Sequence, residues 1–215
     1  MGNHPLFFYM PIIKKIENVS GVVLGGGKSR RMGQDKRILE WEGMKFLDKV
    51  CLTMDKLFDE VLLVTATADY SCAHLPVRLV TDAVSQKGSL GGLYTGIKEA
   101  SHPFVFVVAC DMPFLNSVAI SRLCSLPASD VVMVKLSTGF QPLHGRYSKG
   151  CIPIMEQMIH EGNLRIQSVV NHSALSVQII EESMFSDIDH FFYSFLNINT
   201  PSDLEFARKA ASRLK

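Results

Sequence analysis

The segment Gly21-Val-Val-Leu-Gly-Gly-Gly-Lys-Ser-Arg-Arg-Met-Gly-Gln-Asp-Lys36 decides the fold of this chain. It begins with a short β-branched run, which indicates a buried strand, and continues directly into a glycine-rich loop with four cationic residues. Glycines let backbone N–H groups approach a phosphate or a base closely, and cations offset the charge of a triphosphate. The segment therefore predicts a phosphate-binding loop behind a buried strand.

The loop departs from the two common nucleotide-binding motifs. A P-loop ending at Ser29 would need glycine at position 22, where the chain has Val22, and Arg30 stands where Gly-x-Gly-x-x-Gly needs its third glycine. The alternative interpretation is a glycine-rich turn whose charges are merely solvated.

Further strands and helices alternate along the chain, which predicts an α/β fold: a doubly wound, mostly parallel sheet with a Rossmann-like nucleotide-binding half, in three layers, α/β/α. After residue 137 the pattern weakens. Strands are expected at 61–64, 77–80, 104–108, 131–134 and 177–180, and helices at 45–58, 90–100, 116–126, 152–160, 164–170 and from Ser202 onward.

Composition limits the class of protein. The 215 residues hold 22 Lys and Arg against 21 Asp and Glu, a net charge of +1, so no global field favours nucleic acid or a membrane surface as a partner. The five cysteines are odd in number and show no Cys-x-x-Cys spacing, which favours a reduced, cytoplasmic setting. We expect an N-terminal extension over residues 1–18 and a single domain over 19–215.

A carboxylate ends one of the predicted strands. In Val107-Val-Ala-Cys-Asp-Met-Pro113, Asp111 follows the hydrophobic run and Pro113 prevents the strand from continuing. A carboxylate at a strand end beside a phosphate loop is well placed to hold Mg²⁺, which prefers oxygen ligands and phosphates. The competing interpretation is a cap on the following turn.

A third feature joins another strand end to a helix start. Asp82 follows the strand at 77–80 and could accept a hydrogen bond from a sugar or a base, and Gly88-Ser-Leu-Gly-Gly-Leu93 would let a helix N-terminus approach a ligand. An isolated aspartate in this position can equally be a turn residue.

Together these segments resemble the molybdenum cofactor guanylyltransferases of the MobA type, within the nucleotide-diphospho-sugar transferase-like superfamily. That family carries Leu-Ala-Gly-Gly-x-Ser-x-Arg-Met-Gly-x-Asp-Lys, Gly-Pro-Leu-Ala-Gly, Cys-Asp-Met-Pro and Asn-x-Asn-Thr-Pro-x-Asp-Leu. The corresponding segments here are residues 24–36, 88–92, 110–113 and 197–204. The resemblance covers nearly the whole chain after residue 18.

The resemblance implies roles for particular residues. It implies Mg²⁺ as cofactor, with Asp111 and Asn199 as its ligands, and it places Asn197 and Gln141, with the segment 141–144, at the pterin. Arg31, Lys36 and Asp111 are the expected catalytic residues. The expected nucleotide contacts are Leu24, Gly25, Gly26, Lys36, Thr67, Asp82 and Asp111.

This chain departs from the family pattern at several positions. Gly25 replaces an alanine, and Ser89 and Gly91 replace proline and alanine. All three residues are small, so we expect a looser site. Thr67 stands where the family often has asparagine.

The implied reaction is the transfer of GMP from GTP to the terminal phosphate of molybdopterin, with release of pyrophosphate. GTP and molybdopterin would be the small-molecule partners, and cofactor-insertion proteins and target molybdoenzymes the protein partners. One alternative is cytidylyl transfer to the same pterin, or another small-molecule nucleotidyl transfer. The other is a non-catalytic GTP-binding protein that delivers the cofactor.

Overall fold

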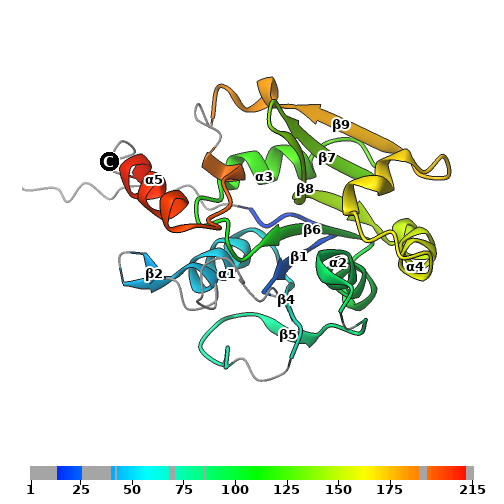
Figure 1. The fold of residues 1–215 in the computed structure, drawn as a ribbon, viewed down its shortest axis with the longest axis horizontal. Coiled ribbons are helices and arrows are strands. Elements are labelled where there is room, and N and C mark those ends of the chain that lie inside the picture. The colour runs from blue at the N-terminus through cyan, green and yellow to red at the C-terminus, as the bar shows by residue number, and fades with distance from the viewer. Residues whose placement is uncertain are drawn as a thin grey trace, which may run out of the picture.

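The computed structural model describes residues 14–25, 40–41, 43–67, 71–84, 86–188 and 193–211. Within them, seven strands form one sheet in the order β5-β4-β1-β6-β8-β7-β9 (Figure 1). These strands are β1 (Val19–Leu24), β4 (Val61–Thr65), β5 (Arg78–Thr81), β6 (Phe104–Ala109), β7 (Val131–Leu136), β8 (Gly139–Ser148) and β9 (Val177–Glu181). A separate pair is β2 (Glu40–Trp41) and β3 (Met44–Lys45). The helices are α1 (Phe46–Leu57), α2 (Gly88–Glu99), α3 (Ser117–Cys124), α4 (Ile152–His160) and α5 (Pro201–Ala211).

The sheet is mostly parallel and doubly wound, as the sequence predicts. Strands β5, β4, β1 and β6 are parallel neighbours, β8 is antiparallel to both β6 and β7, and β9 is parallel to β7. The chain runs outward from β1 to β4 and β5, and then returns through α2 to β6 on the other side of β1. The direction of winding therefore reverses between β1 and β6.

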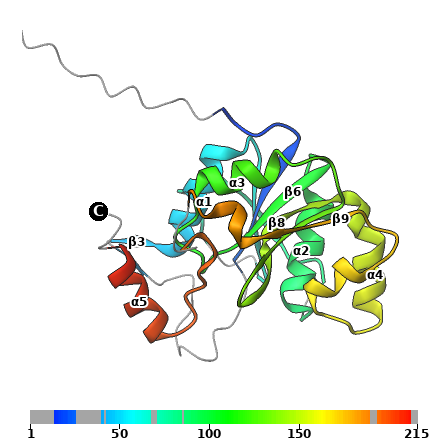
Figure 2. The same cartoon turned by 90° about the horizontal axis from the view of Figure 1, so that it is seen from above.

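Helices cover both faces of the sheet, with α1 and α3 on one side and α2 and α4 on the other (Figure 2). Successive residues of β1 face opposite sides, so Val23 packs in the cluster with α1 and α3 while Val22 packs in the cluster with α2. Helix α2 approaches β1 very closely, because a Cβ on Gly96 would lie 2.6 Å from Cγ1 of Val22. The predicted three-layer arrangement is confirmed, and none of the described helices is long and apolar enough to cross a membrane.

Several elements differ from the sequence prediction. Strands β2, β3 and β8 were not predicted, and residues 166–171 form a 3-10 helix where we expected a regular helix at 164–170. The register of β8 against β7 shifts between Met133 and Val134, so β8 bulges around Pro142, whose carbonyl accepts from the Tyr147 hydroxyl at 2.7 Å. Proline is tolerated in strands mainly at bulges and edges, and its presence hides the strand from pattern analysis.

The end of the expected N-terminal extension lies against α1. Ile16 N donates to the carbonyl of Leu57 at 2.7 Å, and Lys15 Nζ donates to that of Phe58 at 3.1 Å. Residues 1–13 lie outside the described part of the chain, and the boundary after residue 18 stays a prediction.

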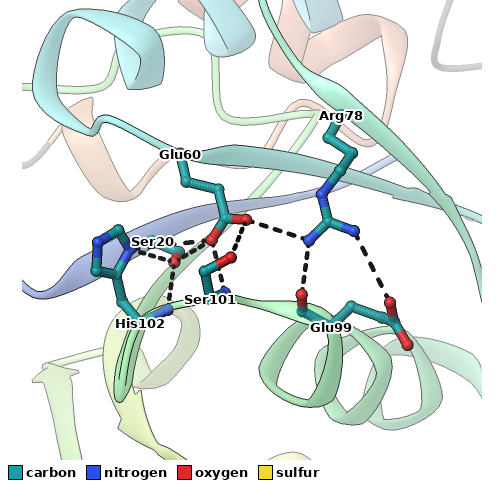
Figure 3. Close-up of polar contacts among 6 residues, drawn as sticks. All are labelled: Ser20, Glu60, Arg78, Glu99, Ser101 and His102. Atoms are coloured by element: carbon teal, nitrogen blue, oxygen red, sulfur yellow. Dashed lines mark hydrogen bonds and ion pairs between the residues drawn. The ribbon is translucent and has the colours of Figure 1, made fainter.

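A polar cluster holds the strands together at their amino ends (Figure 3). Glu60, directly before β4, accepts from the Ser20 hydroxyl of β1 at 2.6 Å and from the Ser101 amide at 2.8 Å. Arg78, at the start of β5, donates to Glu60 at 3.2 Å and to the Glu99 carbonyl at the end of α2 at 2.6 Å. The Glu60 carboxylate thus joins β1, β4, β5 and the turn that follows α2.

The charged state of Glu60 is strongly favoured in the folded protein. Burial disfavours the carboxylate, but hydrogen bonds from Ser20, Ser101 and Arg78 outweigh burial and lower the pKa of Glu60 from 4.5 to about 2. Because the pKa falls on folding, Glu60 stabilises the fold fully above pH 4.5. That contribution is lost as the pH falls from 4.5 toward 2.

Replacing Glu60 with Gln should lower the free energy of unfolding at pH 7 by about 2 kcal/mol, because the charge-assisted hydrogen bonds are lost. Urea denaturation of both proteins at pH 7 and at pH 3 measures the effect, and the difference should shrink at the lower pH. E99Q is the matched control, since Glu99 meets Arg78 only at 3.8 Å and is 47% exposed. A difference between parent and E60Q that does not change with pH would contradict this role of Glu60.

Candidate active site

The carboxyl end of β1 lies between the corresponding ends of β4 and β6. Leu24 is paired with Val64 on one side and with Ala109 on the other. The Cys110 amide donates to the Leu24 carbonyl at 3.1 Å, and the Gly25 amide donates to the Val64 carbonyl at 2.8 Å. Since the winding reverses between β1 and β6, the crevice at this end is the expected ligand site of a doubly wound sheet.

The glycine-rich loop leaves the sheet at this crevice. The Leu24 carbonyl and the Gly25 amide both take part in backbone hydrogen bonds of the sheet, so the positions of these two predicted nucleotide contacts are fixed. Gly26, Arg31 and Lys36, which we predict to contact the nucleotide, lie outside the described residues.

The site is not looser where this chain has glycine in place of alanine. A Cβ on Gly25 would lie 2.8 Å from Cδ1 of Leu63, and a Cβ on Gly91 would lie 2.9 Å from the Val84 carbonyl. Such distances are shorter than van der Waals contact. Neighbouring atoms therefore fill the space that the family's methyl groups would occupy, and our expectation of a looser site is wrong at both positions.

The ends of β4 and β5 bring two predicted nucleotide contacts to the same edge. The Thr65 hydroxyl donates to the Thr67 carbonyl at 2.7 Å, which turns the chain after β4 and leaves Thr67 exposed. The Asp82 amide donates to the Thr65 carbonyl at 2.8 Å, so Asp82 begins its loop beside that turn.

The Asp82 carboxylate is held by its own loop and by α2. Its Oδ1 accepts from the Val84 amide at 3.0 Å and from the hydroxyl of Thr95 at 2.9 Å, and that hydroxyl accepts from the Ala83 amide at 3.1 Å. Asp82 is therefore a turn residue, as the alternative interpretation has it. The same bonds fix the direction of the carboxylate, so this geometry is compatible with a ligand contact as well.

Thr95 is a residue that sequence reasoning missed. It is 1% exposed on the sheet-facing side of α2, where its hydroxyl ties the helix to the Asp82 loop. The pattern of the helix gives no signal for this role, because a threonine between apolar residues is common in a buried helix face.

Helix α2 starts at this edge without a side-chain cap. Its N-cap residue, Lys87, makes no capping hydrogen bond through its side chain, whereas Asn116 caps α3 by accepting from the amides of Val118 and Ala119. The first turn of α2 therefore presents backbone N–H groups and the positive end of the helix dipole beside Asp82.

Asp111 meets the C-terminal segment at the end of β6. It is 8% exposed, and its carbonyl accepts from the amide of Ile198 at 2.9 Å. Ile198 lies between Asn197 and Asn199, so this bond brings both asparagines to the carboxylate-bearing turn. The structure thus places together the expected metal ligands, which are 88 positions apart in the chain.

The chemistry of these side chains suits a hard divalent cation. Asp111 offers carboxylate oxygens and Asn199 an amide oxygen, which are ligands that Mg²⁺ accepts. Among the described residues there is no group of three or more His, Cys, Asp or Glu side chains that could hold a metal on its own. A cation here would thus take its remaining ligands from nucleotide phosphates and water, as Mg²⁺ in phosphoryl-transfer sites commonly does.

Gln141 reaches the same edge through the antiparallel strand. Val108, three residues before Asp111, pairs with His144, three residues after Gln141. Gln141 itself pairs with Val134 and is partly exposed. The predicted pterin contact therefore lies on the side of Asp111 away from the glycine-rich loop.

Comparison with known proteins identifies the family. Residues 21–177 match the MobA-like NTP transferase domain, and the match includes most of β1 and all of β4, β5, β6, β7 and β8. The chain belongs to this family.

Relatives in the MobA-like NTP transferase family match over almost the full chain. A probable molybdenum cofactor guanylyltransferase from Natranaerobius thermophilus is 33% identical over 90% of this chain and 96% of its own length. A molybdenum cofactor guanylyltransferase from Desulfosudis oleivorans is also 33% identical, over 91% and 96%. The crystal structure of molybdopterin-guanine dinucleotide biosynthesis protein A from Archaeoglobus fulgidus has the same fold, with a TM-score of 0.80, 24% identity and coverage of 90% of this chain and 99% of that one.

His144, by contrast, does not face a ligand. We expected it beside the pterin with Gln141, but it is fully buried between the rings of Phe106 and Phe195, at centroid distances of 5.3 and 4.5 Å. Neither ring nitrogen has a hydrogen-bond partner among the described residues. The imidazole is therefore a neutral core side chain, and burial lowers the pKa of His144 from 6.5 to about 3.

The buried imidazole should make the protein sensitive to acid. Because His144 binds a proton more readily in the unfolded chain, its effect on stability is absent above pH 6.5 and grows as the pH falls toward 3. We compare the free energy of unfolding of His144→Leu with that of the parent. The difference should shift in favour of the variant by about 2 kcal/mol between pH 7.5 and pH 4.5.

Urea denaturation at the two pH values measures this difference. H160Q controls for the loss of a histidine, since His160 is exposed at the end of α4. If the gap between H144L and the parent stays constant across pH, His144 does not titrate on unfolding as described.

Proposed function

We propose that this chain transfers GMP from GTP to the terminal phosphate of molybdopterin, releasing pyrophosphate and forming molybdopterin guanine dinucleotide. The observation that carries the proposal is the meeting of three segments at the carboxyl edge of the sheet. The start of the glycine-rich loop, the Asp111 turn and the Asn197–Asn199 segment are joined there by backbone hydrogen bonds. Membership of the MobA-like NTP transferase family makes the chain a nucleotidyltransferase, and the relatives' names support this substrate pair.

The chemistry requires little of the protein beyond placement and charge. An oxygen of the pterin's terminal phosphate forms a bond to the α-phosphorus of GTP, the bond from that phosphorus to the α,β-bridging oxygen breaks, and pyrophosphate leaves with both electrons of that bond. A phosphate monoester is already anionic near neutral pH, so no protein base is needed. Orientation of two anions and neutralisation of the transferred group are then the main sources of rate enhancement.

Each predicted residue has a place in this scheme. We propose that Lys36 and Arg31 neutralise the triphosphate, and that the backbone of Leu24, Gly25 and Gly26 contacts the base. Asp82, with Thr67 beside it, would contact the ribose from the other side of β4. Gln141 would hold the pterin from the β8 side of Asp111. Asn197, next to the Ile198 amide that bonds to Asp111, would hold it from the segment before α5.

We propose Mg²⁺ as the cofactor, held by Asp111 and Asn199. A divalent cation bound there would neutralise charge on the α-phosphate and on the departing pyrophosphate. Asp111 would bind the cation from the end of β6, and Asn199 would bind it from the segment before α5.

We also propose cofactor-insertion proteins and target molybdoenzymes as the protein partners of this chain. A cytoplasmic setting is supported by the cysteines, all five of which are free. Cytidylyl transfer is the nearest alternative reaction. The other alternative, a non-catalytic GTP-binding protein that delivers the cofactor, is excluded if pyrophosphate is released in the measurement described next.

GTP should be preferred over CTP and ATP. The protein is incubated with each nucleotide, Mg²⁺ and molybdopterin, and pyrophosphate is measured. Equal turnover with CTP would contradict the guanylyl assignment, and GTP binding without pyrophosphate release from any nucleotide would favour the non-catalytic delivery protein.

Asp111→Asn should fold like the parent but lose about 10³-fold or more in rate, because the amide keeps the shape of the side chain and removes the charge that a hard cation prefers. Pyrophosphate release at saturating GTP and Mg²⁺ is compared with thermal melting. D59N is the matched control, because Asp59 is an exposed aspartate in the turn before β4, at the opposite end of the strands. Retention of most activity by D111N would make Asp111 a turn residue only.

A further inference from the structure

The segment before α5 is held by one carboxylate. Oδ2 of Asp203 accepts from the amides of both Asn199 and Thr200, each at 2.8 Å. The Thr200 hydroxyl in turn accepts from the Asp203 amide at 3.1 Å. The Thr200–Asp203 pair is a reciprocal capping box, with Pro201 at the first helical position. The bond from Asn199 is additional, because this residue precedes the cap and lies outside the helix.

That additional bond continues toward the sheet. Ile198, the next residue back, donates its amide to the Asp111 carbonyl at 2.9 Å and is fully buried against Phe46, with Leu204 of α5 packed on the same cluster. The successive amides of Ile198 and Asn199 therefore bond in opposite directions, one to Asp111 after β6 and the other to Asp203 of α5.

Aromatic contacts attach α5 to the same region. Phe206 of α5 lies edge-on to Tyr193 at a centroid distance of 6.2 Å, and Tyr193 packs against Phe114, three residues after Asp111, at 6.3 Å. Pairs of this kind stabilise by about 0.5 to 1.5 kcal/mol beyond the area they bury. Helix α5 is thus seated on the Asp111 turn independently of its cap.

We propose that Asp203 is a positioning residue that fixes the backbone of Asn199 so that its side chain is directed to the same cation as Asp111. The proposal rests on the proposed function for the identity of the ligand. The two amides that donate to this carboxylate oxygen lie on either side of the Asn199 Cα, so they restrict both of its backbone dihedrals. The bond to Asp111 fixes the residue before Asn199. Asp203 itself does not touch the nucleotide; it acts through Asn199.

The capping arrangement of α3 shows what distinguishes Asp203. Asn116 accepts from Val118 and Ala119, which both belong to the helix that it caps. Asp203 reaches outside its helix to the amide of a residue that carries a predicted ligand. The outward bond therefore links the cap of α5 to the residue that carries the predicted ligand.

The test compares Asp203→Ala with variants that break the cap but keep the bond to Asn199. Binding of the Mn²⁺–GTP complex is followed by enhancement of water proton relaxation, which needs no turnover, and kcat and KM for pyrophosphate release are measured in parallel. We expect D203A to weaken Mn²⁺–GTP binding and to lower kcat by about 10-fold each, the range found when residues that orient metal ligands are removed. D203E, which keeps a carboxylate able to close a capping box, should restore most of both.

Thr200→Ala is the matched control, because it removes the other half of the capping box and leaves the Asp203 carboxylate on Asn199. It should lower the melting temperature but leave Mn²⁺–GTP binding near that of the parent. E205A, on the same helix, should change neither, since Glu205 is exposed and pairs with Lys209. If D203A melts far below the parent, D203N takes its place, because a neutral oxygen is a weaker acceptor and should give an intermediate loss.

The proposal would be overturned if D203A, or D203N in its place, bound Mn²⁺–GTP as tightly as the parent. It would also be overturned if T200A lost as much affinity for Mn²⁺–GTP as D203A. A parent that binds Mn²⁺–GTP but releases no pyrophosphate would count against the proposed function alone. The comparison of Asp203 variants would then still decide whether this carboxylate positions Asn199.

Discussion

The parallel pairing of β1 with both β4 and β6 is the constraint on which the rest of this structure depends. Leu24 is in register with Val64 and Ala109 at once, so the segments that follow these three strands must emerge side by side. Parallel strands need a long connection between them, and these connections carry the helices to opposite faces of the sheet. The crevice and the layers are thus consequences of one pairing.

The two ends of this sheet are built differently. At the amino ends, the Glu60 carboxylate accepts hydrogen bonds from a hydroxyl, an amide and a guanidinium group of several elements (Figure 3). These polar groups are therefore paired with one another. At the carboxyl ends, α2 starts without a side-chain cap, and Asp111 stands beside a segment that comes from far along the chain. One end is closed by its own polar groups, and the other presents backbone and oxygen atoms to a ligand.

The sequence predicted the strands of the nucleotide-binding half because buried parallel strands are short, continuous and β-branched, as at 61–64 and 104–108. It also predicted that Asp82 and Asp111 follow strand ends at the carboxyl edge of the sheet, since the ends of parallel strands share an edge. It failed at β8, where Pro142 and a bulge interrupt the pattern, and consequently at His144, which the antiparallel register turns into the core. It also could not reveal Thr95 or the fit of Gly25 and Gly91, because these depend on contacts between residues distant in sequence.

Residues 197–203 come later in the chain than every strand of the sheet. During synthesis, β1 through β9 are therefore available to pair before the segment that meets Asp111 has left the ribosome. The order of the chain separates the folding of the scaffold from the completion of the site, so the core can form first and receive α5 as a final docking step. A nascent chain at that stage lacks Asn199, so its Asp111 turn acquires the second predicted metal ligand only at the end.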